Sequence, residues 1–166
     1  LALAACILHK PELLLLDEPT AGVDPKARRD FWDEIHRLAE QGLTVLVSTH
    51  YMDEAERCNE IIYIARGQII TKGTISEVIK SSGLYTAVVK GTNLNQLRQE
   101  LEKNEKLTSV APFGDSLHIC SQDKKVLEET ISPYLNYSDF IWTYEEASME
   151  DAFIHFMTQA EKEGHL

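Results

Sequence analysis

Residues 13–20 read Leu-Leu-Leu-Leu-Asp-Glu-Pro-Thr, the most informative segment for the architecture of this chain. Four consecutive leucines indicate a buried strand of the kind found in the parallel sheet of an α/β protein. Pro19 ends the strand, because proline has no N–H to donate to a neighbouring strand. The carboxyl ends of parallel strands are where such sheets bind ligands, so Asp17 and Glu18 stand at a candidate site. Adjacent strand residues point to opposite sides, so we expect the two carboxylates to have different partners.

The residues that follow predict a helix and a second strand. Asp24 followed by Pro25 is typical of a helix start, and Gly42 is typical of a helix end. Residues 43–48, Leu-Thr-Val-Leu-Val-Ser, are apolar and β-branched and therefore predict a short strand. Strand, helix and strand in this order predict a right-handed βαβ crossover.

The rest of the chain predicts short elements in two groups. Strands are predicted over 61–65, 69–71, 84–90, 107–111, 117–120 and 138–144, and helices over 51–58, 74–81, 93–104, 123–135 and 148–162. Residues 81–83, Ser-Ser-Gly, are predicted to be a linker, which divides the chain into domains 1–83 and 84–166. Pro133 is expected to break its helix, and Asn93 is expected to cap one. The order of elements in the second domain predicts a small α+β, ferredoxin-like sandwich with an added C-terminal helix.

Two further patterns are interpreted as structural. The acidic run at 53–56, Asp-Glu-Ala-Glu, is typical of a solvated helix face. Phe140, Trp142 and Tyr144 alternate along one face of a predicted strand, which favours core packing over a surface for a partner.

The composition limits the class of function. Hydrophobic residues make up 43% of the 166 residues, and the formal net charge is −11. This acidic balance argues against a nucleic-acid scaffold, which would show a basic stripe, although a local phosphate site stays possible. The apolar run at 1–8 is shorter than the roughly 20 residues of a membrane span. Three cysteines without a C-x-x-C spacing favour reduced thiols inside the cell.

Residues 1–76 resemble the C-terminal part of an ABC transporter ATPase domain, because several motifs occur in the order of that family. Residues 13–17 resemble the Walker B strand, and Glu18 follows at the position of the catalytic carboxylate. Residues 21–24, Ala-Gly-Val-Asp, resemble the D-loop. Residues 48–50, Ser-Thr-His, resemble the strand end that carries the switch histidine. The fold implied is α/β, a partial P-loop NTPase core followed by the smaller second domain.

The resemblance implies ATP and Mg²⁺ as cofactors and gives each motif residue a role. Asp17 would bind Mg²⁺ through a water, and Glu18 would polarise the attacking water. His50 would reach the γ-phosphate and sense its loss. Asp24 would lie at the seam between two ATPase domains, and Gly22 would allow the tight turn before it. The alternatives are solvated turn carboxylates, a structural histidine and, for Asp24, only a helix cap.

The main phosphate grip of that family does not occur in these residues. The chain holds no G-x-x-x-x-G-K-[ST] loop, no Q-loop and no Leu-Ser-Gly-Gly-Gln signature. We therefore expect a piece of a longer protein, and negligible ATP affinity and hydrolysis from these 166 residues alone. We also expect apolar surface and an open edge beside the strand at 13–17, which the rest of the protein or a second copy would cover.

The end of the chain narrows the resemblance. Residues 148–153, Ser-Met-Glu-Asp-Ala-Phe, are similar to the Ser-Leu-Glu-Asp-Val-Phe of multidrug and drug-export ATPase subunits. This implies an ATP-binding subunit of an exporter, in the cytoplasm on the inner face of the membrane. Its partners would be a transmembrane permease and a second ATPase domain, with no nucleic acid. The alternatives are a soluble ABC-type ATPase acting on ribosomes or DNA, and a non-catalytic interaction module.

Overall fold

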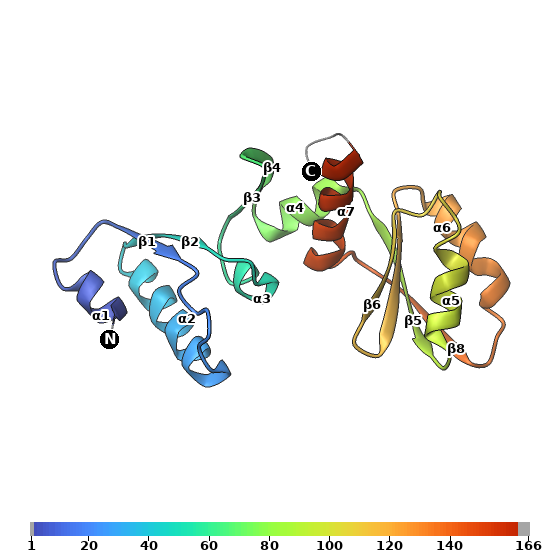
Figure 1. The fold of residues 1–166 in the computed structure, drawn as a ribbon, viewed down its shortest axis with the longest axis horizontal. Coiled ribbons are helices and arrows are strands. Elements are labelled where there is room, and N and C mark those ends of the chain that lie inside the picture. The colour runs from blue at the N-terminus through green and yellow to red at the C-terminus, as the bar shows by residue number, and fades with distance from the viewer. Residues whose placement is uncertain (1, 163–166) are drawn as a thin grey trace. The chain divides into compact units, whose positions relative to one another are not determined.

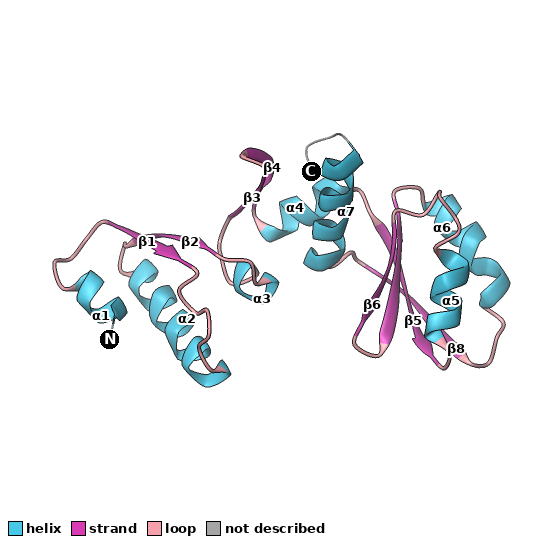
Figure 2. Ribbon diagram, in the orientation of Figure 1, coloured by secondary structure: helices cyan, strands magenta, loops and turns pink. Residues whose placement is uncertain are grey.

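The computed structural model describes residues 2–162, and the chain divides into two compact units, residues 1–58 and residues 59–166. Both units mix helices with strands, as the α/β prediction requires (Figure 2). Every helix in the described part of the chain is too short or too polar to span a lipid bilayer.

The first unit is built on a pair of parallel strands. Its elements are α1 (Ala2–Ile7), β1 (Leu13–Asp17), α2 (Pro25–Glu40), β2 (Thr44–Ser48) and α3 (Met52–Ala55). β1 and β2 pair in parallel from Leu13 opposite Thr44 to Asp17 opposite Ser48, and α2 connects them (Figure 1). The predicted βαβ order is therefore confirmed. The acidic helix is shorter than predicted, because it ends at Ala55.

Local signals in the sequence set both ends of α2. The Asp24 carboxylate accepts hydrogen bonds from the backbone N–H groups of Lys26 and Ala27, each 3.1 Å long. Pro25 occupies the first turn, where a missing N–H is harmless. At the other end Gly42 has a φ of +98°, a left-handed conformation that glycine adopts without strain. The expected helix start and helix end are both confirmed.

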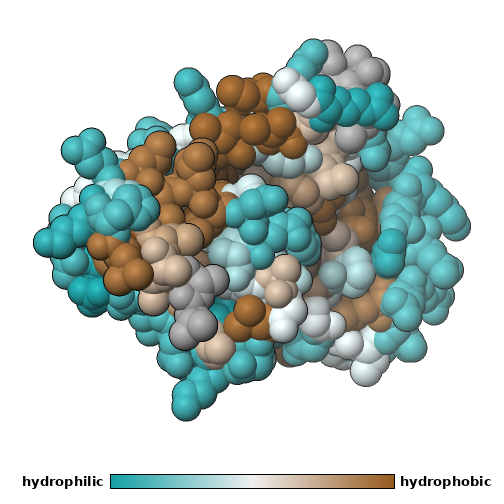
Figure 3. Space-filling view, turned by 60° about the vertical axis from the view of Figure 1, so that its left-hand side comes forward, coloured by the Kyte–Doolittle hydropathy of each residue, from teal (hydrophilic) through white to brown (hydrophobic). Residues whose placement is uncertain are grey.

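The leucine strand is covered on one face of the unit. Leu14 packs with the buried Trp32 and Ile35 of α2. Leu15 points the other way and is 66% exposed, as is typical of period-2 alternation along a strand. Leu13 and Leu46 are also more than half exposed, and apolar side chains gather on the face that Figure 3 presents. The strand is therefore buried on one face only among the described residues, and its exposed leucines match the apolar surface expected beside residues 13–17.

The second unit holds an antiparallel hairpin, a four-stranded antiparallel sheet and the helices around them. Its elements are β3 (Ile61–Ala65), β4 (Gln68–Gly73), α4 (Ile75–Ser82), β5 (Tyr85–Gly91), α5 (Leu94–Leu101), β6 (Ser109–Phe113), β7 (Ser116–Ser121), α6 (Lys124–Ile131), the 3-10 helix η1 (Ser132–Tyr134), β8 (Phe140–Glu145) and α7 (Met149–Lys162). β3 pairs with β4, and the larger sheet has the order β6-β7-β5-β8. The change to a 3-10 turn at Pro133 confirms the predicted break in that helix.

One face of the larger sheet packs against α5 and α6. This core consists of Ala87, Val89, Leu97, Leu101, Leu117, Ile119, Leu127 and Ile131. Phe140 and Trp142 of β8 pack against it, so their interpretation as core residues is confirmed. Tyr144 lies on the same strand face but is 57% exposed, so core packing was wrong for this ring. Asn93 precedes α5 with a φ of +57° and makes no side-chain capping bond, contrary to its predicted role.

The Ser-Ser-Gly segment forms the end of a helix. Ser81 and Ser82 are the last residues of α4, and Gly83 follows with a φ of +63°. The Ser82 side chain is buried, and its carbonyl oxygen accepts a 3.0 Å hydrogen bond from Gln122 Nε2. α7 packs on the same α4 through Phe156 and its neighbours. The chain is therefore ordered through the predicted linker, and the division of domains at residue 83 stays a prediction.

Candidate functional site

The candidate site lies at the carboxyl ends of β1 and β2. Asp17 and Ser48 are directly opposed in the parallel register, and the Ser48 hydroxyl donates a hydrogen bond to Asp17 Oδ1. The backbone N–H of Glu18 donates to the carbonyl oxygen of Ser48 at 2.9 Å. The loops that leave both strands therefore start side by side, which is why motifs more than thirty residues apart can share one site.

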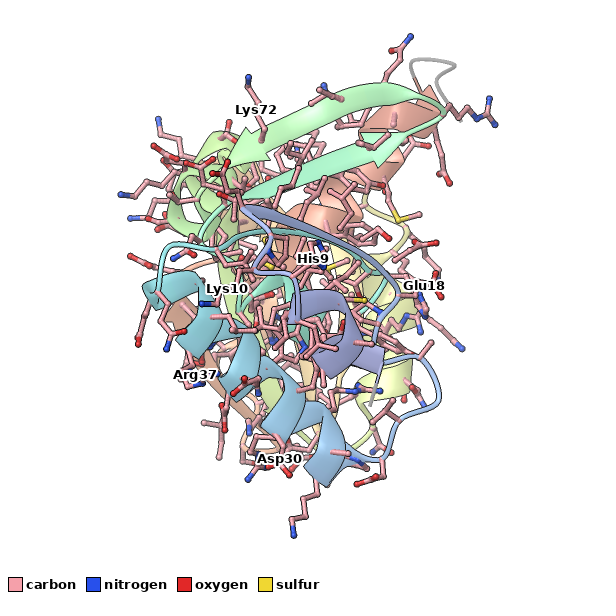
Figure 4. All side chains as sticks on the ribbon, turned by 90° about the vertical axis from the view of Figure 1, so that its left-hand side faces the viewer. His9, Lys10, Glu18, Asp30, Arg37 and Lys72 are labelled. Atoms are coloured by element: carbon pink, nitrogen blue, oxygen red, sulfur yellow. The ribbon has the colours of Figure 1, made fainter. Side chains whose placement is uncertain are left out.

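Glu18 and His50 meet at this edge of the sheet. Glu18 Oε1 lies 3.2 Å from His50 Nδ1, and both side chains are more than half exposed. Figure 4 labels Glu18 in the loop between β1 and α2. Asp17 and Glu18 thus have different partners, as strand alternation predicts. The Glu18 backbone has a φ of +41°, an uncommon conformation for a residue with a side chain and one that recurs at functional sites.

Gly22 and Asp24 lie further along the same loop. Gly22 has a φ of +72°, and the N–H of Val23 donates to the carbonyl oxygen of Thr20 at 3.1 Å, which closes a tight turn. The Asp24 carboxylate binds the first backbone N–H groups of α2. Among the residues that the structure describes, Asp24 makes no hydrogen bond to Glu18 or His50. Its capping role is therefore observed, while a role at a domain seam stays a prediction.

A buried carboxylate behind the site went unnoticed in the sequence. Glu54 has no exposed surface, although the run at 53–56 predicted a solvated face, and that prediction is wrong for this residue. Thr20 donates its hydroxyl hydrogen to Glu54 Oε1, and Thr49 donates to Glu54 Oε2 at 2.7 Å. Glu54 is buried because its helix turns it beneath the loops that carry these two hydroxyls. A run of charges alone gives no signal of such burial.

Arg28 and two rings complete the surroundings of Glu54. Arg28 Nε lies 3.6 Å from Glu54 Oε1, and Arg28 Nη1 lies 3.7 Å from Asp53 Oδ2. The guanidinium sits over the ring of Tyr51, with 4.6 Å between its carbon and the ring centroid, as in a cation–π contact. The Tyr51 ring also contacts the His50 imidazole, at 4.1 Å between centroids. The first turn of α2 is therefore packed against the residues that flank His50.

The residues at the strand ends suit a magnesium ion in part. Mg²⁺ prefers oxygen ligands, keeps several waters and is commonly held by one or two carboxylates with substrate phosphates. Asp17 offers an exposed carboxylate whose Oδ1 is oriented by the Ser48 hydroxyl. No group of three or more His, Cys, Asp or Glu side chains arranged around a metal position occurs in the described residues. The assignment of Asp17 as the residue that would hold the ion stays a prediction.

The comparison with family models finds a match at the start of the chain. The family described as "AAA domain, putative AbiEii toxin, Type IV TA system" matches residues 1–52. The match includes β1, the loop after it, α2, β2 and His50, and therefore the strand ends that form the candidate site.

Curated relatives extend the likeness beyond this region. The Nod factor export ATP-binding protein I of Burkholderia orbicola is 34% identical over 158 residues, which cover 93% of this chain and 50% of that protein. The corresponding protein of Cupriavidus metallidurans is 41% identical over 103 residues, 61% of this chain and 34% of that protein. The probable multidrug ABC transporter ATP-binding protein YbhF of Escherichia coli is 54% identical over 74 residues, 45% of this chain and 13% of that protein. This chain thus spans about half the length, or less, of these relatives.

Proposed function

We propose that residues 1–83 are the C-terminal part of an ATP-hydrolysing domain. The premise is that this chain is a relative of the ABC transporter ATP-binding proteins over most of its length. One observation carries the proposal. Glu18 and His50, which lie at the ends of two parallel strands, approach to 3.2 Å beside an exposed Asp17. A water-orienting carboxylate, a polar sensor and a magnesium ligand are the groups that phosphoryl transfer needs at one place.

The roles of the two carboxylates follow from their different settings. Asp17, oriented by Ser48, would hold Mg²⁺ through a water, and the bound ion would neutralise charge on the phosphates. Glu18 would accept a hydrogen bond from the attacking water, and the exposure of its carboxylate leaves room for that water. Neither role requires a covalent intermediate on the protein.

His50 and the turn after Glu18 would connect the site to its surroundings. His50 lies on the same side as Glu18 and is more than half exposed, so its ring is accessible to a γ-phosphate. Asp24 would contact a second ATPase domain in addition to capping α2, and Gly22 would allow the turn that presents it. A homodimer of the complete ATP-binding protein is the arrangement that this role implies.

Residues 84–166 would form an accessory domain of ferredoxin-like type. The βαββαβ order of β5, α5, β6, β7, α6 and β8 and the strand order β6-β7-β5-β8 support this assignment. α7 would be the helix added to that domain. The described residues of this domain hold no catalytic constellation, so regulation or subunit contact is the role proposed for it.

The complete protein would energise export through a membrane permease. Relatives whose names include Nod factor export and multidrug transport support an exporter, and the location proposed is the cytoplasmic face of the membrane. The net charge of −11 favours this proposal over an ATPase that acts on ribosomes or DNA, since nucleic-acid binding relies on basic surface. We propose that the 166-residue chain alone is inactive.

The proposal is tested by supplying the phosphate-binding half. The chain is fused after the N-terminal half of the Burkholderia orbicola relative, and ATP binding and turnover are measured. We expect turnover in the fusion and none in the 166-residue chain. Glu18→Gln should lower kcat by about 100-fold or more, as is typical when a general base is lost. Glu12→Gln, an exposed control before β1, should leave kcat unchanged. A fusion that hydrolyses ATP equally well with Glu18→Gln would refute the proposal.

A further inference from the structure

Glu54 is a fully buried carboxylate in a four-residue helix just behind His50. Burying a carboxylate is unfavourable unless hydrogen bonds and a nearby cation compensate. Glu54 has both kinds of partner, and they come from separate segments of the first unit. The positions of these partners show that Glu54 contacts the loops after β1 and β2 at once.

Each carboxylate oxygen of Glu54 serves a different loop. Oε1 accepts the hydroxyl hydrogen of Thr20, in the loop after β1, and Oε2 accepts that of Thr49, in the loop after β2. Thr20 is 1% exposed, so its bond to Glu54 is shielded from water. One planar group therefore joins the two loops at a fixed separation.

The same two loops carry Glu18 and His50. Thr20 lies in the turn that starts at Glu18, where the N–H of Ala21 donates to the Glu18 carbonyl oxygen at 3.1 Å. Thr49 immediately precedes His50, and its hydroxyl also accepts a 3.1 Å hydrogen bond from the N–H of Tyr51. His50 thus lies between the two residues joined by the Tyr51–Thr49 hydrogen bond, and the Thr49 hydroxyl of that bond is held by Glu54. Movement of either threonine would move the neighbouring side chain of the site.

Arg28 adds the start of α2 to this arrangement. Its Nε is buried and has no hydrogen-bond partner among the described residues, and it lies 3.6 Å from Glu54 Oε1. Arg28 sits one turn into the helix that Asp24 caps, and its backbone N–H donates to the Asp24 carbonyl oxygen at 2.9 Å. The Arg28 guanidinium therefore places a positive charge beside Glu54 from the first turn of α2, the helix that Asp24 caps.

We propose that Glu54 is a positioning residue for ATP hydrolysis, which sets the 3.2 Å approach of Glu18 and His50 by bridging Thr20 and Thr49. This inference rests on the proposed function of the site. In the bridge as it stands, both hydroxyls donate, and the carboxylate supplies an acceptor oxygen to each. Glutamine has the same shape but presents an NH₂ group to one hydroxyl, which must then accept and donate its own hydrogen elsewhere. Glutamine also removes the charge that faces Arg28, so Glu54→Gln is the informative substitution.

The fusion described above supplies the kinetic test. Glu54→Gln should lower kcat by about 100-fold, the effect expected of a small misplacement of catalytic groups, with the KM for ATP unchanged. Added to Glu18→Gln, it should cause no further loss, because it acts through the same step. Glu56→Gln, an exposed glutamate two residues along, is the matched control and should keep the original kcat.

Smaller changes guard against a variant that fails to fold. Thr20→Val and Thr49→Val each remove one hydroxyl at nearly constant volume and should lower kcat. Thr20→Ser and Thr49→Ser keep the hydroxyl and should keep the original kcat. In the 166-residue chain, Glu54→Gln should speed amide hydrogen exchange at Ala21 and Tyr51 and leave Ile35 within α2 unchanged.

The outcomes separate this inference from the proposed function. If Glu18→Gln leaves turnover intact, the proposed function fails, and amide exchange still reports whether Glu54 joins the loops. If Glu18→Gln abolishes turnover while Glu54→Gln keeps kcat, or if the losses multiply in the double variant, the positioning role is overturned.

Discussion

The imidazole of His118 lies 3.1 Å from Asp151 Oδ2, which ties β7 to the first turn of α7. The same carboxylate oxygen accepts hydrogen bonds from the backbone N–H and the hydroxyl of Ser148, both 2.9 Å long. The N–H of Asp151 donates back to the Ser148 hydroxyl at 3.0 Å. One buried carboxylate thus completes a reciprocal capping pair with Ser148 and fastens the helix to the sheet.

Removal of this carboxylate should weaken the second unit. Asp151→Ala removes the carboxylate that binds the backbone N–H and the hydroxyl of Ser148, and it leaves His118 without its partner. We therefore expect a loss of about 3 kcal/mol in the free energy of unfolding. Urea unfolding measures this loss, and hydrogen exchange of the β7 amides locates it in the second unit. Asp123→Ala is the control, because that carboxylate caps α6 at an exposed site and should cost about 1 kcal/mol. Equal losses for both variants would contradict the double role.

Truncation of two neighbouring leucines of β1 should change stability to very different extents. Leu14→Ala opens a cavity against Trp32 and should cost about 3 kcal/mol, whereas the exposed Leu15→Ala should change stability by no more than about 0.5 kcal/mol. In a Trp142→Phe background the fluorescence of Trp32 reports on the first unit alone. A large loss with Leu15→Ala in this chain would mean that its side chain is packed.

The cysteines should differ sharply in reactivity. Burial, together with the nearby charge of Asp151, raises the pKa of the Cys120 thiol to about 12. Cys6 is exposed, so a disulfide reagent at pH 8 should label it rapidly, since the thiolate is the reactive form. Cys120 should react only when the second unit unfolds. Mass spectrometry of partly labelled protein distinguishes the two sites, and rapid labelling of Cys120 in folded protein would contradict its burial.

The raised pKa of Cys120 also gives a pH dependence of stability. Between about pH 9 and pH 12 the unfolded chain loses the thiol proton while the folded chain keeps it, so stability falls as pH rises. The contribution is fully present below pH 9. Comparison with Cys120→Ala isolates it, because the difference in unfolding free energy between the two proteins should decrease over this range. A constant difference would show that Cys120 titrates normally.

Two glycines form a matched pair for a backbone test. A Cβ at Gly91 would lie 2.0 Å from the carbonyl oxygen of Asp139, so Gly91→Ala should push β5 from β8 and cost about 3 kcal/mol. Gly114 has a φ of +57° with nothing within 4 Å, so Gly114→Ala should cost only about 1 kcal/mol of backbone strain. Thermal unfolding of both variants gives the comparison, and equal melting temperatures would contradict it.

Much of the fold could be predicted because its signals are local. The Asp24–Pro25 start of α2 and the apolar β1 and β2 depend on neighbouring residues alone. Burial could not be predicted in this way. The exposed face of Leu15 depends on which layers are present, and the order at Ser82 depends on contact with Gln122, forty residues later.

The exposed motif residues of the candidate site could be predicted from the sequence, but the buried residue behind them could not. Asp17, Glu18 and His50 belong to motifs with family spacing, and the structure brings Glu18 to His50. Glu54 escaped prediction because its burial depends on hydroxyls that become its neighbours only after the two strands pair. A charged run is read as solvated by default, and no local pattern corrects that reading.

The left-handed backbone at Glu18 sets stability against chemistry at a single position. Glycine adopts a φ of +41° more readily than glutamate does, so a search for thermostable variants would favour Glu18→Gly. The proposed chemistry requires the carboxylate that such a search would discard. Random mutagenesis selected for heat resistance alone should therefore enrich catalytically dead proteins at this codon, and a glutamate retained there would mark selection for turnover.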